Sequence, residues 1–236
     1  MSEVIMIASG KGGVGKTTVT ALLGSQLARM DKTVVMLDTD FGLRNLDLYF
    51  QLQERIVYNL VDVLCGTCSF QQAIIPIDEQ RHLYLIPGSK DYHFRLTSEA
   101  FRILTQQLSR QFDVVLIDTP AGITHTHTAI LPVITQALVV TTMTEAALSD
   151  GMAMCRFLHT RNLTARCIFN QLERPIFPSH QRERLQEISQ ELLMAEYLGG
   201  IPMIKGHRSY DLFVLRGSLQ QICTRLSLCD SYLCTE

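Results

Sequence analysis

The run from Gly10 to Thr18 is the stretch of this sequence best suited to chemistry. It reads Gly-Lys-Gly-Gly-Val-Gly-Lys-Thr-Thr and matches the phosphate-binding pattern Gly-x-x-x-x-Gly-Lys-[Ser/Thr] at every position. Its four glycines allow a sharp turn that aims several backbone N–H groups at a phosphate. A helix following such a loop adds the positive end of its dipole. We therefore expect this loop to bind the phosphates of a nucleotide.

Two side chains of the loop have specific expected roles. Lys16 is placed to reach the β- and γ-phosphates as a point charge, and the Thr17 hydroxyl is placed to ligate Mg²⁺. The flanking segments argue against a glycine-rich turn with a stray lysine, because Val4–Ala8 reads as a buried strand and Thr18–Met30 as a helix. The residues expected to bind the nucleotide are Gly10, Lys11, Gly12, Gly13, Val14, Gly15, Lys16, Thr17, Thr18, Gly122 and Asn170.

Two carboxylates, Asp38 and Asp40, directly follow a second apolar strand at Val34–Leu37. In an open parallel sheet, ligands bind beyond the carboxyl ends of the strands, so both acids are expected at the same edge as the glycine loop. We assign Asp38 to the metal site and Asp40 to orienting the water that attacks the γ-phosphate. The alternative is a turn that carries acids without a function.

A third acid, Asp118, ends the apolar run that starts at Phe112. A buried strand that delivers one carboxylate to the surroundings of a metal has the form of a Walker B element, so Asp118 joins Thr17 and Asp38 in the expected Mg²⁺ site. Gly122 follows shortly after. It would let this loop place a backbone N–H near the γ-phosphate and move when that phosphate leaves.

Asn170 follows the expected strand Ala165–Phe169, late in the chain. Its carboxamide can donate and accept hydrogen bonds at once, so it can read the edge of a purine. We expect Asn170 to contact the base.

The remaining groups of metal-binding residue types are interpreted as structural. His125 and His127 have no evident third ligand, so we expect a solvated loop or the start of a helix there. Cys65 and Cys68 have no second cysteine pair at matching distance. The cysteines number seven, an odd count, and no export signal precedes them, which favours reduced thiols in the cytosol.

The alternation of strand-like and helix-like segments predicts an α/β fold with a mostly parallel sheet covered on both faces. No linker or repeat interrupts it, so we expect one domain over residues 1–236. The later strands are expected at Thr33–Leu37, His82–Ile86, Val114–Ile117, Ala137–Thr141, Ala165–Phe169 and Leu198–Met203. The later helices are expected at Asn59–Cys65, Ser98–Arg110, Ala147–Thr160, Ser179–Tyr197 and Ser218–Leu228.

The composition limits the classes of partner. Apolar residues make up 47% and charged residues 19% of the chain, enough for a sizeable core. The net charge is −2, so nothing in the overall charge favours nucleic acid or an anionic membrane as partner. No apolar run reaches the ~20 residues that span a bilayer.

These motifs together resemble the MinD/ParA family of ATPases. The second lysine of the loop, Lys11, stands before Gly12–Thr18 as in the deviant Walker A loop of that family. The segments Asp38–Asp47 and Arg55–Leu64 are similar to the MinD branch, and Asp118–Gly122 matches its second switch. The resemblance covers roughly residues 2–170 and implies the three-layer P-loop NTPase fold.

The resemblance also implies a mechanism. ATP and Mg²⁺ would be the cofactors, and two copies of the chain would close over two nucleotides. Lys11 would contact the phosphates held by the other copy, so Lys11, Lys16 and Asp40 are the expected catalytic residues. The implied role is positioning in a bacterial cell, typically of the division site, with a regulator similar to MinE or MinC. Such a protein is cytoplasmic, with or without peripheral attachment to the inner face of the membrane.

Four departures from the MinD branch leave alternatives open. The segment Ser218–Leu228 has one basic residue, Arg225, so a membrane anchor is not evident. Only Asp150 remains of the partner-binding acids, Gln171 follows Asn170 in place of arginine, and Met203-Ile204-Lys205 replaces acidic residues. One alternative is a nucleotide-binding adaptor for a flagellar, secretion or partition apparatus. The other is a ParA-like ATPase that binds the nucleoid, although nucleic acid is not the expected partner.

Overall fold

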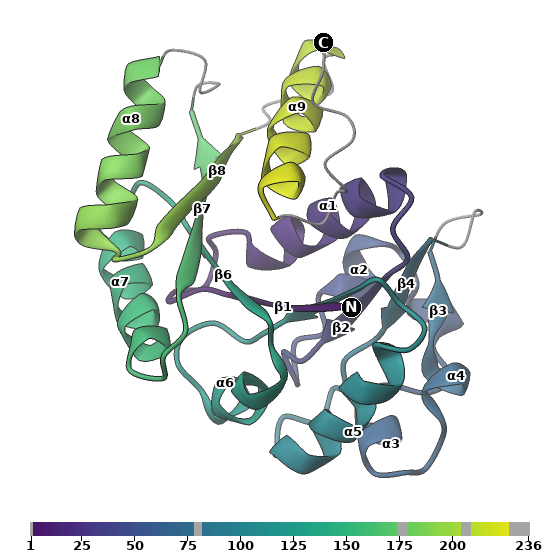
Figure 1. Ribbon diagram of the computed structural model, residues 1–236. Coiled ribbons are helices and arrows are strands. Elements are labelled where there is room, and N and C mark those ends of the chain that lie inside the picture. The colour runs from purple at the N-terminus through teal and green to yellow at the C-terminus, as the bar shows by residue number, and fades with distance from the viewer. Residues whose placement is uncertain (1, 78–81, 174–178, 204–208, 227–236) are drawn as a thin grey trace.

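The computed structural model describes residues 2–77, 82–173, 179–203 and 209–226 (Figure 1). Within these residues one eight-stranded sheet runs in the order β3-β4-β2-β5-β1-β6-β7-β8. Only the short edge strand β3 is antiparallel to its neighbour β4. The strands are β1 (Glu3–Ala8), β2 (Val34–Asp38), β3 (Ile75–Pro76), β4 (Leu83–Ile86), β5 (Val114–Asp118), β6 (Gln136–Thr141), β7 (Ala165–Leu172) and β8 (Glu196–Pro202). The predicted α/β fold with a mostly parallel sheet is therefore confirmed.

Helices cover both faces of this sheet, which gives three layers (Figure 1). One face packs against α5, α6 and α7, and the other against α1 and α9. The α-helices are α1 (Lys16–Arg29), α2 (Leu46–Tyr49), α3 (Leu60–Leu64), α4 (Phe70–Ala73), α5 (Ser98–Leu108), α6 (His125–Ile130), α7 (Glu145–His159), α8 (Ser179–Glu187) and α9 (Ser209–Arg225). The shorter helical turns are η1 (Gln53–Arg55), η2 (Leu131–Val133) and η3 (Ile188–Leu192).

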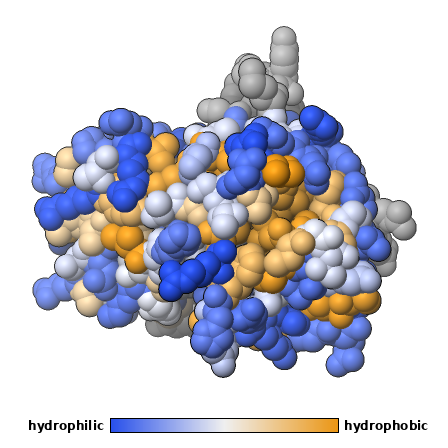
Figure 2. Space-filling view, turned by 90° about the horizontal axis from the view of Figure 1, so that it is seen from below, coloured by the Kyte–Doolittle hydropathy of each residue, from blue (hydrophilic) through white to orange (hydrophobic). Residues whose placement is uncertain are grey.

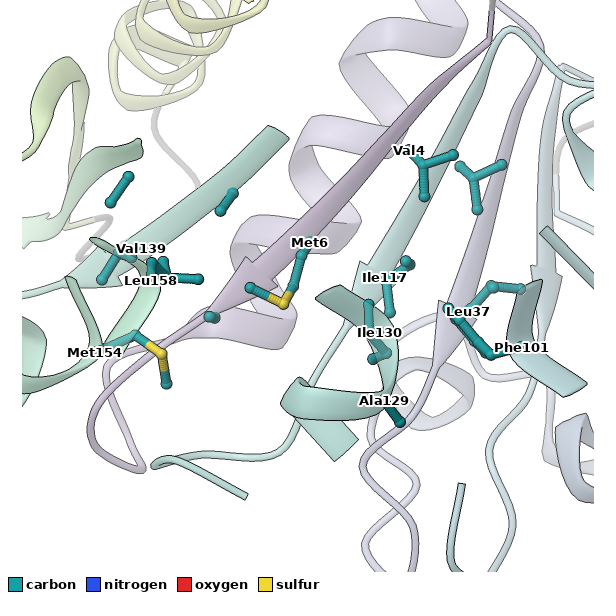
Figure 3. Close-up of a cluster of buried hydrophobic side chains, with 14 of the residues drawn as sticks. Val4, Met6, Leu37, Phe101, Ile117, Ala129, Ile130, Val139, Met154 and Leu158 are labelled. Carbon is teal, nitrogen blue, oxygen red and sulfur yellow. The ribbon is translucent and has the colours of Figure 1, made fainter. Parts of the chain in front are cut away.

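The central strand β1 shows why the chain needs two helical layers. Successive side chains of a strand point to opposite faces, and here both sets are apolar. Val4 and Met6 lie in the core beneath α5, α6 and α7, where Figure 3 shows them with residues of three other strands. Ile5 and Ile7 lie in the second core, against α1 and α9. A strand that is apolar on both faces is stable only when helices cover each face.

The helix α5 illustrates how the sequence specifies a layer. Thr97 caps its start, where the side-chain oxygen accepts a hydrogen bond from the N–H of Ala100 at 3.4 Å. Phe101, Leu104 and Leu108 recur at helical spacing and are all buried. This single apolar stripe fixes the face that α5 turns to the sheet.

The expected helix Ser179–Tyr197 is wrong in its second half. The α-helix ends at Glu187, a π-helical turn covers Ile188–Leu192, and strand β8 begins at Glu196. Pairing with β7 determines this end of the segment, because Glu196 lies opposite Arg166 and forms an ion pair with it at 3.1 Å. Local helix propensity does not report such long-range pairing.

Other boundaries also differ from the expected ones. The last helix begins at Ser209 instead of Ser218, and Gly217 lies inside it facing open space. The short elements α2, β3 and α4 were not expected, and neither were the turns η1 and η2. The end of the expected helix Ser218–Leu228, the rest of the C-terminal segment and Ile204-Lys205 lie outside the described residues. Among the described helices none is long and apolar enough to cross a membrane.

Candidate nucleotide-binding site

The glycine loop connects the end of β1 to the start of α1, as its pattern predicts. Gly13 and Gly15 have φ angles of +82° and +85°, in the left-handed region that favours glycine. Gly15 is the N-cap of α1, so the loop lies against the positive end of that helix. The Ser9 hydroxyl donates a hydrogen bond to the carbonyl of Lys11 at 3.1 Å and holds the entry to the loop.

The carboxylate of Asp118 accepts hydrogen bonds from an ammonium group and two hydroxyl groups at the end of this loop and in the first turns of α1. Because β1 and β5 are parallel and pair Ile7 with Asp118, the acid lies at the edge where the loop begins. Lys16 Nζ donates to one oxygen of Asp118 at 2.7 Å, and Thr17 Oγ1 donates to the other at 2.7 Å. Thr20 Oγ1 donates to the first oxygen at 3.1 Å. Thr20 was not expected in the site, although its place one turn after Lys16 is a signal for it.

Asp38 lies beside this cluster, at the end of the neighbouring strand β2. It is fully buried and is the register partner of Asp118. The backbone N–H groups of Asp40, Asn45 and Leu46 donate to its carboxylate at 3.0, 3.0 and 3.2 Å. Burial and then the Asp118 charge raise the pKa of Asp38 to about 7, and the N–H groups offset only part of this rise.

Asp40 lies further out and is half-buried. Burial raises the pKa of its carboxyl, the positive charge of Lys16 lowers it, and Asp118 raises it again. The turn beyond Asp40 is held by Arg44, which has a φ of +53° and makes an ion pair with the buried Asp47 at 2.6 Å. This ion pair was not expected, and it fixes the path of the chain that carries Asp38 and Asp40.

Gly122 belongs to the loop between β5 and α6, which lies against the glycine loop. Its φ is +73°, and its N–H donates to the carbonyl of Ser9 at 2.9 Å. The hydroxyl of Thr119 donates to the carbonyl of Ile7 at 2.8 Å. The loop 119–124 is therefore attached at two points to the segment that leads into the phosphate-binding loop.

His127 lies in the first turn of α6, so the predicted helix start is correct but the predicted solvation is wrong for this residue. Its side chain is fully buried. The N–H of Thr124 donates to Nδ1 at 3.3 Å, so Nε2 carries the proton and donates to Thr119 Oγ1 at 3.0 Å. Burial and, to a smaller extent, the charge of Lys16 lower the pKa of His127 to about 4. A neutral histidine thus braces the loop 119–124.

We predict that this histidine makes the fold sensitive to acid. Its pKa is about 4 in the fold against a usual 6.5, so the unfolded chain takes up the proton first as the pH falls. The contribution of neutral His127 to the free energy of unfolding is fully present above pH 6.5 and is lost as the pH falls toward 4. We expect the free energy of unfolding in urea to drop by about 2 kcal/mol between pH 6.5 and 5 from this group. A His127→Gln variant should lose this part of the pH dependence, and an unchanged profile would contradict the assignment.

Asn170 and Gln171 at the end of β7 reach the opposite flank of the glycine loop. Asn170 is buried, and its Nδ2 donates to the carbonyl of Val14 at 2.8 Å. Gln171 is exposed, and its Nε2 donates to the carbonyl of Gly13 at 3.2 Å. Asn170 therefore lies beside the glycine loop, and its predicted contact with the base stays a prediction. Gln171 is a contact that the sequence reasoning missed.

Lys11 and Lys16 have opposite environments within one loop. Lys16 is only 6% exposed, against Asp118, whereas Lys11 is exposed together with Gly12 and Gly13. Of the predicted catalytic residues, Lys16 and Asp40 therefore lie together at the carboxyl edge of the sheet. Lys11 lies in the solvent-exposed part of the glycine loop.

The residues at the carboxyl edge of the sheet fit a nucleoside triphosphate with Mg²⁺. The buried acids Asp38 and Asp118 face one buried lysine, an excess of negative charge that a divalent cation would neutralise. The donor set of carboxylates and the Thr17 hydroxyl consists of oxygens, which Mg²⁺ prefers. Among the described residues no cluster of three His, Cys, Asp or Glu side chains could hold a metal unaided.

Comparison with known proteins agrees with this arrangement. A profile of the AAA domain family matches residues 2–172. The septum site-determining protein MinD of a Synechocystis strain is 37% identical over 207 residues, covering 86% of this chain and 76% of that protein. MinD of Bacillus subtilis is 37% identical over 198 residues, covering 81% and 73%.

Solved structures of MinD proteins also have the fold of this chain. MinD in the MinC:MinD cell division complex of Aquifex aeolicus superimposes with a TM-score of 0.80 at 26% identity, over 99% of both chains. MinD of Pyrococcus horikoshii, solved with Mg-ADP, gives a TM-score of 0.76 at 25% identity over 96% of both chains. With a P-loop, a Walker B acid and these relatives, the chain belongs to the MinD/ParA family of P-loop ATPases, enzymes that use ATP and Mg²⁺, and within it resembles MinD.

Proposed function

We propose that this ATPase is a dimerising switch of the MinD type, whose ATP-bound and ADP-bound states differ in self-association. The observation that carries the proposal is the contrast between the two loop lysines. Lys16 is buried against Asp118 in its own chain, whereas Lys11 is exposed at the rim. A cation at the mouth of a phosphate site can serve a nucleotide held by a second copy, as an arginine finger does.

Exposed apolar side chains on the loops around the glycine loop support an interface between two copies at this edge of the sheet. Leu43, Ile123 and Met143 follow β2, β5 and β6 at the carboxyl edge of the sheet, and they are 67%, 49% and 41% exposed. Figure 2 shows, on one face of the molecule, apolar side chains gathered in patches among hydrophilic ones. Apolar surface of this kind is buried at protein interfaces.

The proposed mechanism is mainly electrostatic. The glycine-loop N–H groups and Lys16 bind the phosphates, and Asp40 orients the attacking water. The Thr17 hydroxyl, Asp38 and Asp118 would hold Mg²⁺, which supplies charge neutralisation at the phosphate oxygens. Hydrolysis transfers the γ-phosphoryl group to water and yields ADP and phosphate. In this proposal the loop of Gly122 responds to that loss, which is supported by the hydrogen bond from the Gly122 N–H to the carbonyl of Ser9 beside the glycine loop.

The cellular role that we propose is spatial positioning in a bacterial cell, most directly of the division site. The relatives described above are septum site-determining proteins, and one structure contains MinD together with MinC. We therefore propose a regulatory partner of the MinC kind. A plasmid partition protein from Borrelia burgdorferi shares the fold with a TM-score of 0.76 but only 20% identity, so the comparisons favour division over the adaptor and nucleoid-binding alternatives.

The test compares Lys11→Ala with Asp40→Ala by sizing in Mg-ATP and by phosphate release. We expect wild type to dimerise with ATP and return to monomer after hydrolysis. Lys11→Ala should bind ATP, stay monomeric and hydrolyse slowly, because the second copy lacks its cation. Asp40→Ala should bind ATP and remain dimeric, because the water is no longer oriented. Lys90→Ala, which alters an exposed lysine on another loop, is the matched control. A Lys11→Ala variant that dimerises and hydrolyses normally would refute the proposal.

A further inference from the structure

Two consecutive carboxamides of β7 bind two consecutive carbonyls of the phosphate-binding loop. Asn170 Nδ2 lies 2.8 Å from the carbonyl oxygen of Val14, and Gln171 Nε2 lies 3.2 Å from that of Gly13. In a regular strand neighbouring side chains point to opposite faces, so both would not reach one loop.

A local irregularity of β7 explains how they do. The register between β7 and β8 shifts between Phe169 and Leu172, and Gln171 has a φ of +57°. A left-handed conformation is uncommon for a residue other than glycine, and it persists only where the surrounding structure holds it. Here it turns the Gln171 side chain to the same loop as that of Asn170.

The contacts have a direct consequence for the phosphate site. A trans peptide is planar, so its C=O and its N–H point in opposite directions. Anchoring the carbonyl of Gly13 to Gln171 therefore turns the N–H of Val14 away from β7. Anchoring the carbonyl of Val14 to Asn170 does the same for the N–H of Gly15. Both N–H groups are thus turned to the side of the loop opposite β7, and a loop of this kind binds phosphate oxygens through N–H groups that point to one side.

The packing at Gly15 shows how closely β7 approaches. A Cβ placed on Gly15 would lie 2.4 Å from Asn170 Nδ2 and 3.6 Å from Gln171 Nε2. The loop thus follows its path against the two carboxamides, and Val14 between the anchored carbonyls is buried.

We propose that Asn170 and Gln171 form an amide clamp that holds the glycine loop in its phosphate-binding conformation before the nucleotide arrives. Gln171 is a positioning residue in this clamp. The proposal depends on one part of the proposed function, namely that the glycine loop binds phosphate. It assigns Gln171 to the phosphate end of the ligand, not to the base.

The test compares two ligands that differ in the base. Mg-ADP carries both base and phosphates, whereas Mg-pyrophosphate carries phosphates alone, and each displaces a fluorescent ADP analogue from the protein. Gln171→Leu removes the donor at an exposed position, so the fold should be kept, which thermal unfolding checks. Gln171→Glu places an acceptor opposite the Gly13 carbonyl. Gln106→Leu, the same change on the exposed side of α5, is the matched control.

The clamp predicts that Gln171→Leu weakens ADP and pyrophosphate by the same factor, about 2- to 10-fold, as expected for one lost hydrogen bond. Gln171→Glu should weaken both at least as much, and Gln106→Leu should change neither. A loss confined to ADP would show that Gln171 reads the base and would overturn the clamp, as would unchanged affinities for both ligands. A wild type that binds neither ligand would instead refute the proposed function, and the clamp with it.

Discussion

Replacing Gly10 with alanine is expected to weaken nucleotide binding about 100-fold or more, whereas replacing Gly12 should leave it nearly unchanged. A Cβ on Gly10 would lie 1.9 Å from the carbonyl oxygen of Asp150 and 2.8 Å from the backbone nitrogen of Gly151. Both atoms are backbone of α7, which cannot give way as a flexible side chain would. A Cβ on Gly12 would meet nothing within 4 Å.

The size of the expected loss of affinity in Gly10→Ala follows from the geometry of the loop. Either the loop or α7 must move to admit the methyl group of Gly10→Ala, and a misplacement of about 1 Å in a positioned site can cost about 10²-fold. We expect the affinity for Mg-ATP to fall at least that much in Gly10→Ala and by less than about threefold in Gly12→Ala. Titration calorimetry measures both. Equal affinities for the two variants would mean that contact with α7 does not set the loop conformation.

The second large effect is expected from Asp118→Asn. The carboxylate of Asp118 balances the buried charge of Lys16 and accepts hydrogen bonds from Thr17 and Thr20. Asparagine keeps the size but removes the charge, which leaves a buried lysine without its counterion. Breaking a buried ion pair on one side typically costs about 3–5 kcal/mol, and we expect a loss of stability at the lower end of that range.

Activity should fall further than stability in Asp118→Asn, because the same carboxylate belongs to the proposed Mg²⁺ site. Loss of one group that stabilises transition-state charge typically costs about 10²–10³ in rate, which phosphate release would measure. The matched control is Asp113→Asn, the same change just before the other end of β5, at an exposed carboxylate that accepts hydrogen bonds from Thr33. A variant at Asp118 that hydrolyses ATP as fast as this control would remove Asp118 from the metal site.

The local features of this protein could be predicted from its sequence for physical reasons. The glycine loop is recognisable because left-handed φ angles at Gly13 and Gly15 demand glycine. The strands are recognisable because both faces are covered, so their residues are apolar throughout. Asp38 and Asp118 could be placed at one edge because parallel strands bring their carboxyl ends together, and the register pairs these two residues.

Only the tertiary structure decided which groups meet across the chain. Lys16 and Asp118 are 102 residues apart, and Gln171 and Gly13 are 158 apart. The burial of His127 depends on the helix and strands around it, so its residue type alone suggested solvent. The contact of Gly10 with α7 likewise involves backbone atoms, which carry no sequence signal. Sequence patterns report local conformation and burial, whereas side-chain partners at such separations are set by how the layers pack.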